Sequence, residues 1–366
     1  MILRLVFLVS LLMGLPLLGV FLIDKPVERY LEFPPLTRYV EHTGFSWGIF
    51  MGSAFFLALV LSLFLVAVGM AKKSVPLRRG RAVPFPWWGW AGIGFLAVAW
   101  FLAWTRFPWF SALQPFTFSP LWLGYIVVVN ALVFQRTGFC LMLDRPQYFL
   151  ALFPLSAVFW WFFEYLNRFV QNWYYVGVSE FTPIEYVVHA TLPFSTVLPA
   201  VLSTTEWLQC FPRLHETFGH LWTVRLRRTK ILGWVGLIVA SAGLVGIGIW
   251  PDALFPLLWI SPLLIITSLQ ALLGERTVFS SLANGDWRPI WLPALAGLMC
   301  GFFWELWNAN SLAHWEYAVP LVHRFQIFEM PLLGYAGYLP FGIECKVIAD
   351  LLPQGWRAGS FRPDRA

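Results

Sequence analysis

Long apolar stretches separated by short polar segments recur along the whole chain. A helix of about 20 predominantly apolar residues is long enough to cross a membrane. By this measure the sequence predicts ten spans, at Leu3–Ile23, at Phe45–Met70, and at residues 87–105, 117–134, 147–167, 183–205, 231–250, 256–274, 289–308 and 327–350. The first is interpreted as an uncleaved anchor, because its apolar run is long and no small-residue cleavage site follows it. Any re-entrant segment is expected in the proline-rich stretches 181–199 and 320–340.

The composition supports the same fold class. Of the 366 residues, 59% are hydrophobic and 12% are charged, whereas soluble domains carry about 25% charged residues. We therefore expect an all-α, polytopic transmembrane protein, and we exclude a soluble enzyme, a nucleic-acid-binding protein and a disordered regulator. The net charge of +6 on so apolar a chain indicates orientation in a membrane, not a nucleic-acid partner.

Lys and Arg residues predict the orientation of these spans, because cytoplasmic loops are enriched in them. Basic residues concentrate in every second loop, most densely after the second span (Lys72, Lys73, Arg78, Arg79, Arg81) and after the sixth (Arg213, Arg225, Arg227, Arg228, Lys230). Ten spans with both termini in the cytoplasm fit this pattern. We expect the protein in the bacterial inner membrane.

An internal repeat is visible in the apolar part of the chain, where residues 87–206 match residues 231–344. The clearest match pairs FFEYLN at 162–167 with FWELWN at 303–308, and Trp173-Tyr174-Tyr175 also matches Trp315-Glu316-Tyr317. Each unit holds four predicted spans, an even number, so the two copies should run the same way across the membrane, related by a pseudo-twofold axis along its normal. The expected organisation is 2 + 4 + 4: two N-terminal helices in residues 1–86, repeats at 87–229 and 230–352, and a cytoplasmic tail at 353–366.

Glu164 and Glu305 are the first candidates for chemistry. Each lies in an apolar helix, after two aromatic residues and three positions before an asparagine, Asn167 or Asn308. The i, i+3 spacing places Glu and Asn on one helix face, so the amides are expected to bond the carboxylates, and both asparagines are candidate substrate-binding residues. An ionisable group inside lipid costs several kcal/mol, and burial favours its protonated form, which can donate a proton. The alternative is structural: a Glu–Asn pair that fastens neighbouring helices, or a Glu that reaches the outer interface.

Four aromatic residues near the predicted span ends are candidate substrate-binding positions: Trp173, Tyr175, Trp315 and Tyr317. They lie where each repeat leaves the membrane. One interpretation is an aromatic belt at the lipid headgroups. The other is the wall of a site for a flat, apolar or cationic ligand.

Two arginines and one further glutamate have similar alternatives. Arg136 and Arg276 follow the fourth and eighth spans, and they are either cytoplasmic anchors or groups that hold a lipid phosphate. Glu344 has Lys346 and Asp350 close in sequence, which favours a local charge network.

Histidine and cysteine patterns predict neither a metal site nor a cofactor. The four cysteines show no C-x-x-C spacing. A haem held between transmembrane helices needs two buried imidazoles, and only His189 falls clearly within a span. His215-Glu216 and His220 are spaced one residue too widely for the zinc-binding H-E-x-x-H motif.

Short segments resemble a known group of membrane enzymes. Trp173-Tyr174-Tyr175, followed by Thr182-Pro183-Ile184-Glu185-Tyr186 and an apolar run, resembles the lycopene cyclase domain of carotenoid biosynthesis, and Phe163-Glu164 and Trp304-Glu305-Leu306-Trp307 are similar to the W-E segment of transmembrane terpene cyclases. The resemblance implies a helical membrane enzyme that protonates a polyene and lets it cyclise without a cofactor, with Glu164, Glu305 and Glu185 as candidate acids. Aromatic faces would stabilise the developing carbocation. The chain departs from the family where Tyr186, not a second acid, follows Glu185.

Three functional hypotheses remain open on the sequence. The first is an intramembrane enzyme that acts on an isoprenoid or other lipid by acid chemistry from paired glutamates between the repeats. The second is a proton- or ion-coupled transporter or flippase with a parallel repeat. The third is a non-catalytic subunit of a membrane complex, whose aromatic faces pack against partner helices or pigments. In each case the expected partner is a membrane lipid, another hydrophobic small molecule, or the rest of a membrane complex.

Overall fold

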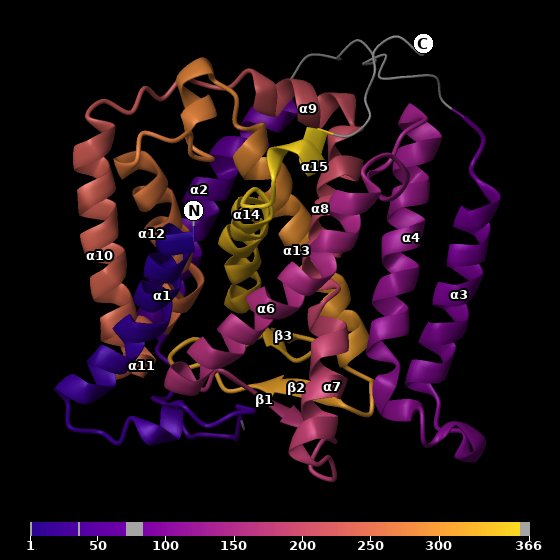
Figure 1. The fold of residues 1–366 in the computed structure, drawn as a ribbon, viewed down its shortest axis with the longest axis horizontal. Coiled ribbons are helices and arrows are strands. Elements are labelled where there is room, and N and C mark those ends of the chain that lie inside the picture. Colours follow the sequence, from indigo (N-terminus) through magenta and orange to yellow (C-terminus); the bar gives the residue numbers. More distant parts are fainter. Residues whose placement is uncertain (1, 36, 71–82, 359–366) are drawn as a thin grey trace.

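The computed structural model describes residues 2–35, 37–70 and 83–358, and the described chain is mostly helical (Figure 1). The longer helices are α1 (Ile2–Leu22), α2 (Trp47–Met70), α3 (Trp87–Trp104), α4 (Phe118–Thr137), α6 (Pro146–Val170), α7 (Pro183–Phe194), α8 (Val197–Gln209), α9 (Pro212–Gly219), α10 (Thr229–Ile249), α12 (Ser261–Leu272), α13 (Arg288–Asn308) and α14 (Tyr338–Ala349). Three short helices complete the set, α5 (Leu141–Asp144), α11 (Pro251–Leu254) and α15 (Gln354–Ala358). The basic residues at 72–81 and residues 359–366 of the expected tail lie outside the described residues.

The protein is a polytopic helical membrane protein. Seven described helical segments are long and apolar enough to cross a membrane when α7 and α8 are counted together as Pro183–Gln209. An eighth span results if the bent pair Pro251–Trp259 and Ser261–Leu272 counts as one. The two other predicted spans coincide with the apolar helix α1 and with α14, which is 12 residues long. Each of the ten predicted spans therefore has a helical counterpart, and the count of ten membrane crossings stays a prediction.

Both proline-rich stretches contain breaks in helical structure. Helix α7 ends at Phe194, one residue after Pro193, and α8 begins at Val197. Proline lacks an N–H and clashes with the preceding turn, so a helix tends to break beside it. In the last predicted span, residues 326–331 form the strands β3 (Gln326–Ile327) and β4 (Met330–Pro331), Leu332–Gly337 is a 3-10 helix, and α14 begins only at Tyr338.

Helices α13 and α14 are in close backbone contact where they cross, because glycines lie at the crossing. A Cβ atom at Gly342 would lie 2.0 Å from the carbonyl oxygen of Pro293, and one at Gly297 would lie 2.5 Å from the carbonyl oxygen of Tyr338. Small residues let transmembrane helices approach in this way. The contact places Tyr338, the first residue of α14, against the middle of α13.

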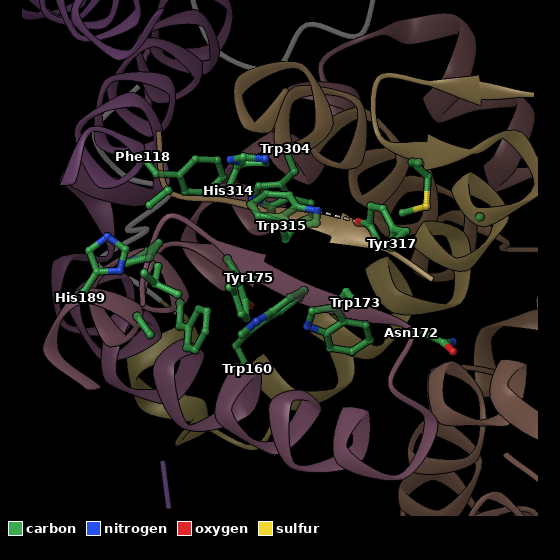
Figure 2. A pocket seen from close by; sticks show the side chains of 18 of the residues that line it. Phe118, Trp160, Asn172, Trp173, Tyr175, His189, Trp304, His314, Trp315 and Tyr317 are labelled. Carbon is green, nitrogen blue, oxygen red and sulfur yellow. Dashed lines mark hydrogen bonds between the residues drawn. The ribbon is translucent and has the colours of Figure 1, made fainter. Parts of the chain in front are cut away.

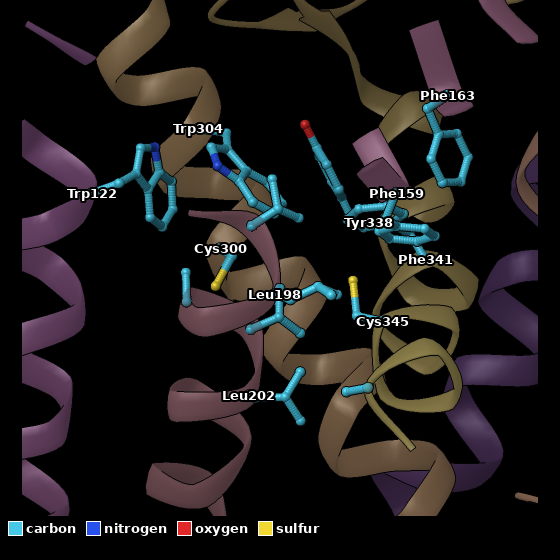
Figure 3. Packing of buried hydrophobic residues seen from close by; sticks show 14 of the residues in the cluster. Trp122, Phe159, Phe163, Leu198, Leu202, Cys300, Trp304, Tyr338, Phe341 and Cys345 are labelled. Carbon is cyan, nitrogen blue, oxygen red and sulfur yellow. The ribbon is translucent and has the colours of Figure 1, made fainter. Parts of the chain in front are cut away.

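Aromatic side chains pack among aliphatic ones in the centre of the molecule (Figure 3). The ring centroids of Trp122 and Trp304 are 5.0 Å apart, and those of Phe163 and Phe341 are 5.4 Å apart. Such edge-to-face and offset contacts add stability beyond the burial of area. The same cluster links α4, α6, α13 and α14, so these helices form one packed body.

Two short strands pair at one end of the helical bundle (Figure 1). β1 (Trp173–Val176) and β2 (His314–Tyr317) are antiparallel, with Tyr174 opposite Glu316, Trp173 opposite Tyr317, and Tyr175 opposite Trp315. Each strand reads Trp-x-Tyr, so the Trp of one strand faces the Tyr of the other. The hydroxyl of Tyr174 donates to the carboxylate of Glu316, which also fixes the register at the central pair. These strands were not predicted, and they join the two candidate aromatic segments into a single unit.

Asp286 and Arg288 form an ion pair at the start of α13. The guanidinium of Arg288 donates from Nε to Oδ1 of Asp286 at 2.8 Å and from Nη2 to Oδ2 at 2.9 Å. Partial burial acts to raise the pKa of Asp286, but these hydrogen bonds outweigh it and hold the pKa below its usual value. Because the folded-state pKa is depressed, the pair stabilises the protein above the unfolded pKa of about 3.9, and this stabilisation is lost as the pH falls through the folded pKa.

We expect Asp286→Asn to destabilise the protein at pH 7 by roughly 1 kcal/mol, as charge-assisted, bidentate hydrogen bonds do when one partner loses its charge. The measurement is detergent-solubilised thermal unfolding between pH 7 and pH 3, where the difference from wild type should shrink as the pH approaches 3. Glu275→Gln is the control, since the Arg4–Glu275 pair is exposed and such pairs contribute little. Equal effects of the two substitutions at pH 7 would contradict the assignment.

Candidate functional site

Glu164 accepts three hydrogen bonds from aromatic side chains. Its side chain is fully buried in α6, and its Oε1 accepts from Nε1 of Trp160 at 3.0 Å, from Nε1 of Trp173 at 3.1 Å and from the hydroxyl of Tyr175 at 2.6 Å. Trp160 lies one turn earlier on α6. Trp173 and Tyr175 are two residues apart on β1, so the strand presents both on one side. The second carboxyl oxygen, Oε2, has no hydrogen-bond partner.

Glu305 has a corresponding environment on α13. Its side chain is also fully buried, and its Oε1 accepts from the hydroxyls of Tyr317 at 2.7 Å and Tyr338 at 2.6 Å. Trp315 reaches the same group indirectly, because its Nε1 donates to the hydroxyl of Tyr317 at 2.8 Å. Here too Oε2 has no partner. Both carboxyls thus act as acceptors for the Trp-x-Tyr strand that follows their own helix.

The two environments differ at one position. Trp160, which lies four residues before Glu164, has Gly301 as its counterpart four residues before Glu305. A Cβ atom at Gly301 would lie 2.2 Å from the ring of Tyr338. The glycine therefore leaves room for a phenol from α14 to occupy the place that an indole from α6 takes beside Glu164.

The expectation that Asn167 and Asn308 bond the glutamates is wrong. Asn167 donates from Nδ2 to the carbonyl oxygen of Trp173 at 2.7 Å, and its Oδ1 accepts from the backbone N–H of Asn172 at 2.8 Å. Asn308 donates to the carbonyl oxygen of Trp315 at 2.6 Å and accepts from the N–H of the same residue at 2.8 Å. Each buried amide satisfies the main chain of the strand just after its helix, where no helical partner is present. The asparagines hold the aromatic strands in place and act on the glutamates only through them.

A pocket lies between the two carboxyl environments (Figure 2). Its empty volume is about 1360 Å³, including open space at its mouth, and nearly half of its lining residues are Phe, Trp or Tyr. Trp160, Trp173 and Tyr175 lie on one side, and Trp304, Trp315 and Tyr317 lie on the other (Figure 2). All four predicted aromatic candidates therefore line one pocket.

The side chains that donate to the glutamates form the walls of this pocket, whereas Glu164 and Glu305 themselves are not among its lining residues. Tyr175, Tyr317 and Tyr338 each have a hydroxyl on a carboxyl and a ring in the lining. A phenol oxygen can take up one proton and release another. Each of these tyrosines is thus placed to pass a proton between a buried carboxyl and a bound molecule.

Glu185 lies away from the pocket lining. Its Oε2 accepts from the backbone N–H of Thr182 at 2.8 Å, and the hydroxyl of Thr182 accepts from the N–H of Glu185 at 3.4 Å. This is a capping box at the first turn of α7. The structure accounts for Glu185 as a helix cap, and the role of third acid implied by the resemblance finds no geometric support.

The candidate arginines also lie outside the pocket lining. Arg136 is in the last turn of α4, with its guanidinium 4.3 Å from the ring centroid of Phe211, and Arg276 is exposed after α12. The expected charge network around Glu344 is wrong. Lys346 bonds Asp350, and Glu344 is fully buried with neither carboxyl oxygen bonded. One helical turn separates Lys346 from Asp350, while Glu344 lies on another face of α14.

Sequence reasoning missed three side chains that complete the site, Trp160, Trp304 and Tyr338. Trp160 and Trp304 line the pocket from α6 and α13, with ring centroids 6.4 Å apart. Trp160 carried no distinguishing signal among the 22 tryptophans of the chain. Trp304 belongs to the W-E segment that carries the resemblance to terpene cyclases, but it was not predicted to be a site residue. Tyr338 reaches Glu305 only because α14 crosses α13 at Gly301, a contact between segments 33 residues apart.

Comparisons with protein families, with curated proteins and with solved structures find no match to this chain. Its site is therefore interpreted from its own geometry. Among the described residues, no three His, Cys, Asp or Glu side chains come together in an arrangement that could hold a metal ion. The chemistry available in the pocket is that of aromatic rings, phenol hydroxyls and the two carboxyls behind them.

Proposed function

We propose that the protein is an intramembrane enzyme that binds an isoprenoid or other lipid in the aromatic pocket and rearranges it by proton transfer. One protonated carboxyl, Glu164 or Glu305, gives its proton to a phenol of Tyr175, Tyr317 or Tyr338, and the phenol gives its own proton to the bound molecule. The resulting carbocation then loses a proton from a neighbouring carbon by the reverse path to a carboxylate, so the product is an isomer and the acid is restored. The observation that supports this most is that the hydrogen-bond donors of both buried carboxyls are walls of one pocket. This is also the chemistry that the resemblance to membrane cyclases implies.

The pocket lining favours a molecule that is mainly apolar. Aromatic and aliphatic side chains dominate it, and a lipid chain gains free energy on leaving water for such a site. When a polyene is protonated, positive charge develops on carbon. Aromatic faces attract positive charge, so the same walls that bind the chain stabilise the charged intermediate.

We infer that residues 87–229 and 230–352 are the two copies of an internal repeat, in the 2 + 4 + 4 order. The supporting observations are the paired strands, centred on Tyr174 and Glu316, and the two Glu-centred hydrogen-bond sets on α6 and α13. A pseudo-twofold axis through the strand pair relates the two sets. In this arrangement the strands lie at the outer end of the membrane and both termini lie in the cytoplasm.

The test compares lipid extracts, by mass spectrometry, from wild-type cells, a deletion strain, and the deletion strain carrying the wild-type gene or Tyr338→Phe. The expected result is one isoprenoid or lipid that disappears on deletion while an isomer of equal mass accumulates. The wild-type gene should restore it, and Tyr338→Phe should restore it only weakly, since one phenol of the relay is gone. Extracts that do not differ between wild type and deletion would contradict an enzymatic role.

Binding without conversion is the second candidate, as in a transporter or in a subunit of a larger membrane complex. It is favoured by one observation: each Oε1 is already occupied by side chains of the pocket wall, so the glutamates could serve only to hold the rings. A lipid that co-purifies with the protein while all extracts keep the same composition would support this candidate over the first.

A further inference from the structure

Two buried glutamates lie behind the walls of the pocket and not in its lining. None of the residues that line it, all of them in the described part of the chain, is Lys, Arg, Asp or Glu. Two histidines, His189 and His314, belong to the lining, and Glu164 and Glu305 lie behind the walls on its two sides, each one side chain away from the pocket space. Neither histidine is free for an anionic headgroup at Nε2, because that of His189 bonds the carbonyl oxygen of Pro115 and that of His314 lies 3.5 Å from a carboxylate oxygen of Glu316. A positive centre would lie between two carboxyl groups.

The polar edges of the wall residues are turned toward the acids. Trp160 and Trp173 use their N–H groups on Glu164, and Tyr317 and Tyr338 use their O–H groups on Glu305. Since the glutamates do not line the pocket, these edges face away from it and the ring surfaces remain for a ligand. A ring that donates a hydrogen bond to a carboxyl gains electron density, which strengthens its attraction for a cation.

The two walls meet at Trp160 and Trp304, whose ring centroids are 6.4 Å apart. An amine held beside this contact therefore touches rings of both walls. At the far side of Trp173, Asn172 also lines the pocket and is 4% exposed, and its Oδ1 has no hydrogen-bond partner. An unpartnered acceptor favours a ligand that brings a donor or a positive charge.

We propose that the ligand of this pocket carries a positive centre, a quaternary or protonated amine on an apolar chain. The amine lies among the indole and phenol rings between Glu164 and Glu305, and the chain extends along the apolar lining. This inference rests on the proposed function only in taking the pocket as the ligand site, and it does not depend on a chemical conversion. It concerns the ionised form of the carboxyls, whereas proton donation uses the protonated form of one of them.

The test uses three probes: hexanoylcholine, its uncharged carbon isostere 3,3-dimethylbutyl hexanoate, and hexyl sulfate. Each probe is titrated at matched detergent concentration with and without protein, so that affinities are compared after correction for partition into the micelles. Binding to the purified full-length protein in a non-ionic detergent is measured by isothermal titration calorimetry. The choline ester should bind at least about tenfold more tightly than the isostere, a difference of about 1.4 kcal/mol, and hexyl sulfate should bind most weakly. Equal affinity for the choline ester and its isostere, or tighter binding of hexyl sulfate, would overturn the proposal.

Two carboxyl variants test whether the preference for the cationic probe arises at this pocket. Glu305→Gln should lower the preference for the cation severalfold, because it removes one acid and keeps the shape of the wall. Glu344→Gln is the matched control, since Glu344 is equally buried but, unlike Glu305, bonds none of the side chains that line the pocket, and it should leave the preference unchanged. A parallel loss in both variants would show that the preference is not set at this pocket. If Glu305→Gln does not fold, Trp304→Leu gives the same readout, with a loss of cation preference expected.

The two proposals fail in different ways. Selective binding of the choline ester together with unchanged lipid extracts would contradict the enzymatic role and leave the cation site in place. Conversion of a lipid with no preference for the cationic probe would contradict the cation site alone.

Discussion

Replacing Glu305 by Gln is expected to lower the rate of lipid conversion by at least about 100-fold, the lower range of what a general acid contributes. The amide keeps the size of the side chain and one acceptor oxygen for Tyr317 and Tyr338. It cannot release a proton. The measurement is the conversion rate of purified protein in liposomes made with lipid extract from the deletion strain. Glu305→Asp, which retains the acid on a shorter chain, should recover part of the rate.

The control for this substitution is Glu344→Gln, which changes an equally buried carboxyl in the neighbouring helix α14 and should keep the wild-type rate. A structural role would show differently. If Glu305 only holds the rings, Glu305→Gln and Glu305→Asp should lose activity in proportion to lost stability, with no change in the pH dependence of the remaining rate. Wild-type activity in Glu305→Gln would remove the carboxyl from the mechanism.

Gly342→Ala is expected to destabilise the protein by a net of about 2 kcal/mol. The added Cβ would lie 2.0 Å from the backbone carbonyl oxygen of Pro293, and a backbone atom cannot rotate away. Overpacking of this kind costs about 1–3 kcal/mol or more, and the gain in helix propensity from Gly to Ala, about 1 kcal/mol, offsets only part of it. The measurement is unfolding of the detergent-solubilised protein by heat or denaturant.

The same substitution at Gly94, in the middle of α3, serves as the comparison. Nothing lies within 4 Å of a Cβ at that position, so Gly94→Ala should be neutral or stabilising. Because the α13–α14 crossing also positions Tyr338 against Glu305, Gly342→Ala should impair the site as well. Equal stability of the Gly342 and Gly94 variants would show that the crossing is less tight than the structure indicates.

The sequence predicts the helical fold because membrane spans are long and apolar, and hydropathy measures that property directly. It does not predict where proline divides an apolar stretch. Residues 183–205 meet the criterion for one span although α7 and α8 break between Phe194 and Val197. Residues 327–350 meet it although only Tyr338–Ala349 is α-helical.

Part of the site was predictable because its residues are recognisable from short stretches of sequence. Glu164 and Glu305 stand out as acids in apolar helices, and the Trp-x-Tyr segments follow each of them closely in sequence. The contacts of Tyr338 with Glu305, and of Trp160 with Trp304, depend on how separate helices cross. Asn167 and Asn308 were placed on the correct helix face but given the wrong partner, because helix spacing alone does not show that the next strand needs its main chain satisfied.

The most direct test of the central claim, that the carboxyl-backed aromatic pocket is the ligand site, is an experimental structure of the protein isolated in its native lipids. We expect an elongated bound molecule in the pocket, against the rings of Trp160 and Trp304 and within hydrogen-bonding distance of the hydroxyl of Tyr175 or Tyr338. A structure in which bound lipids lie only on the outer surface of the helices, with the two aromatic walls collapsed against each other, would contradict the account.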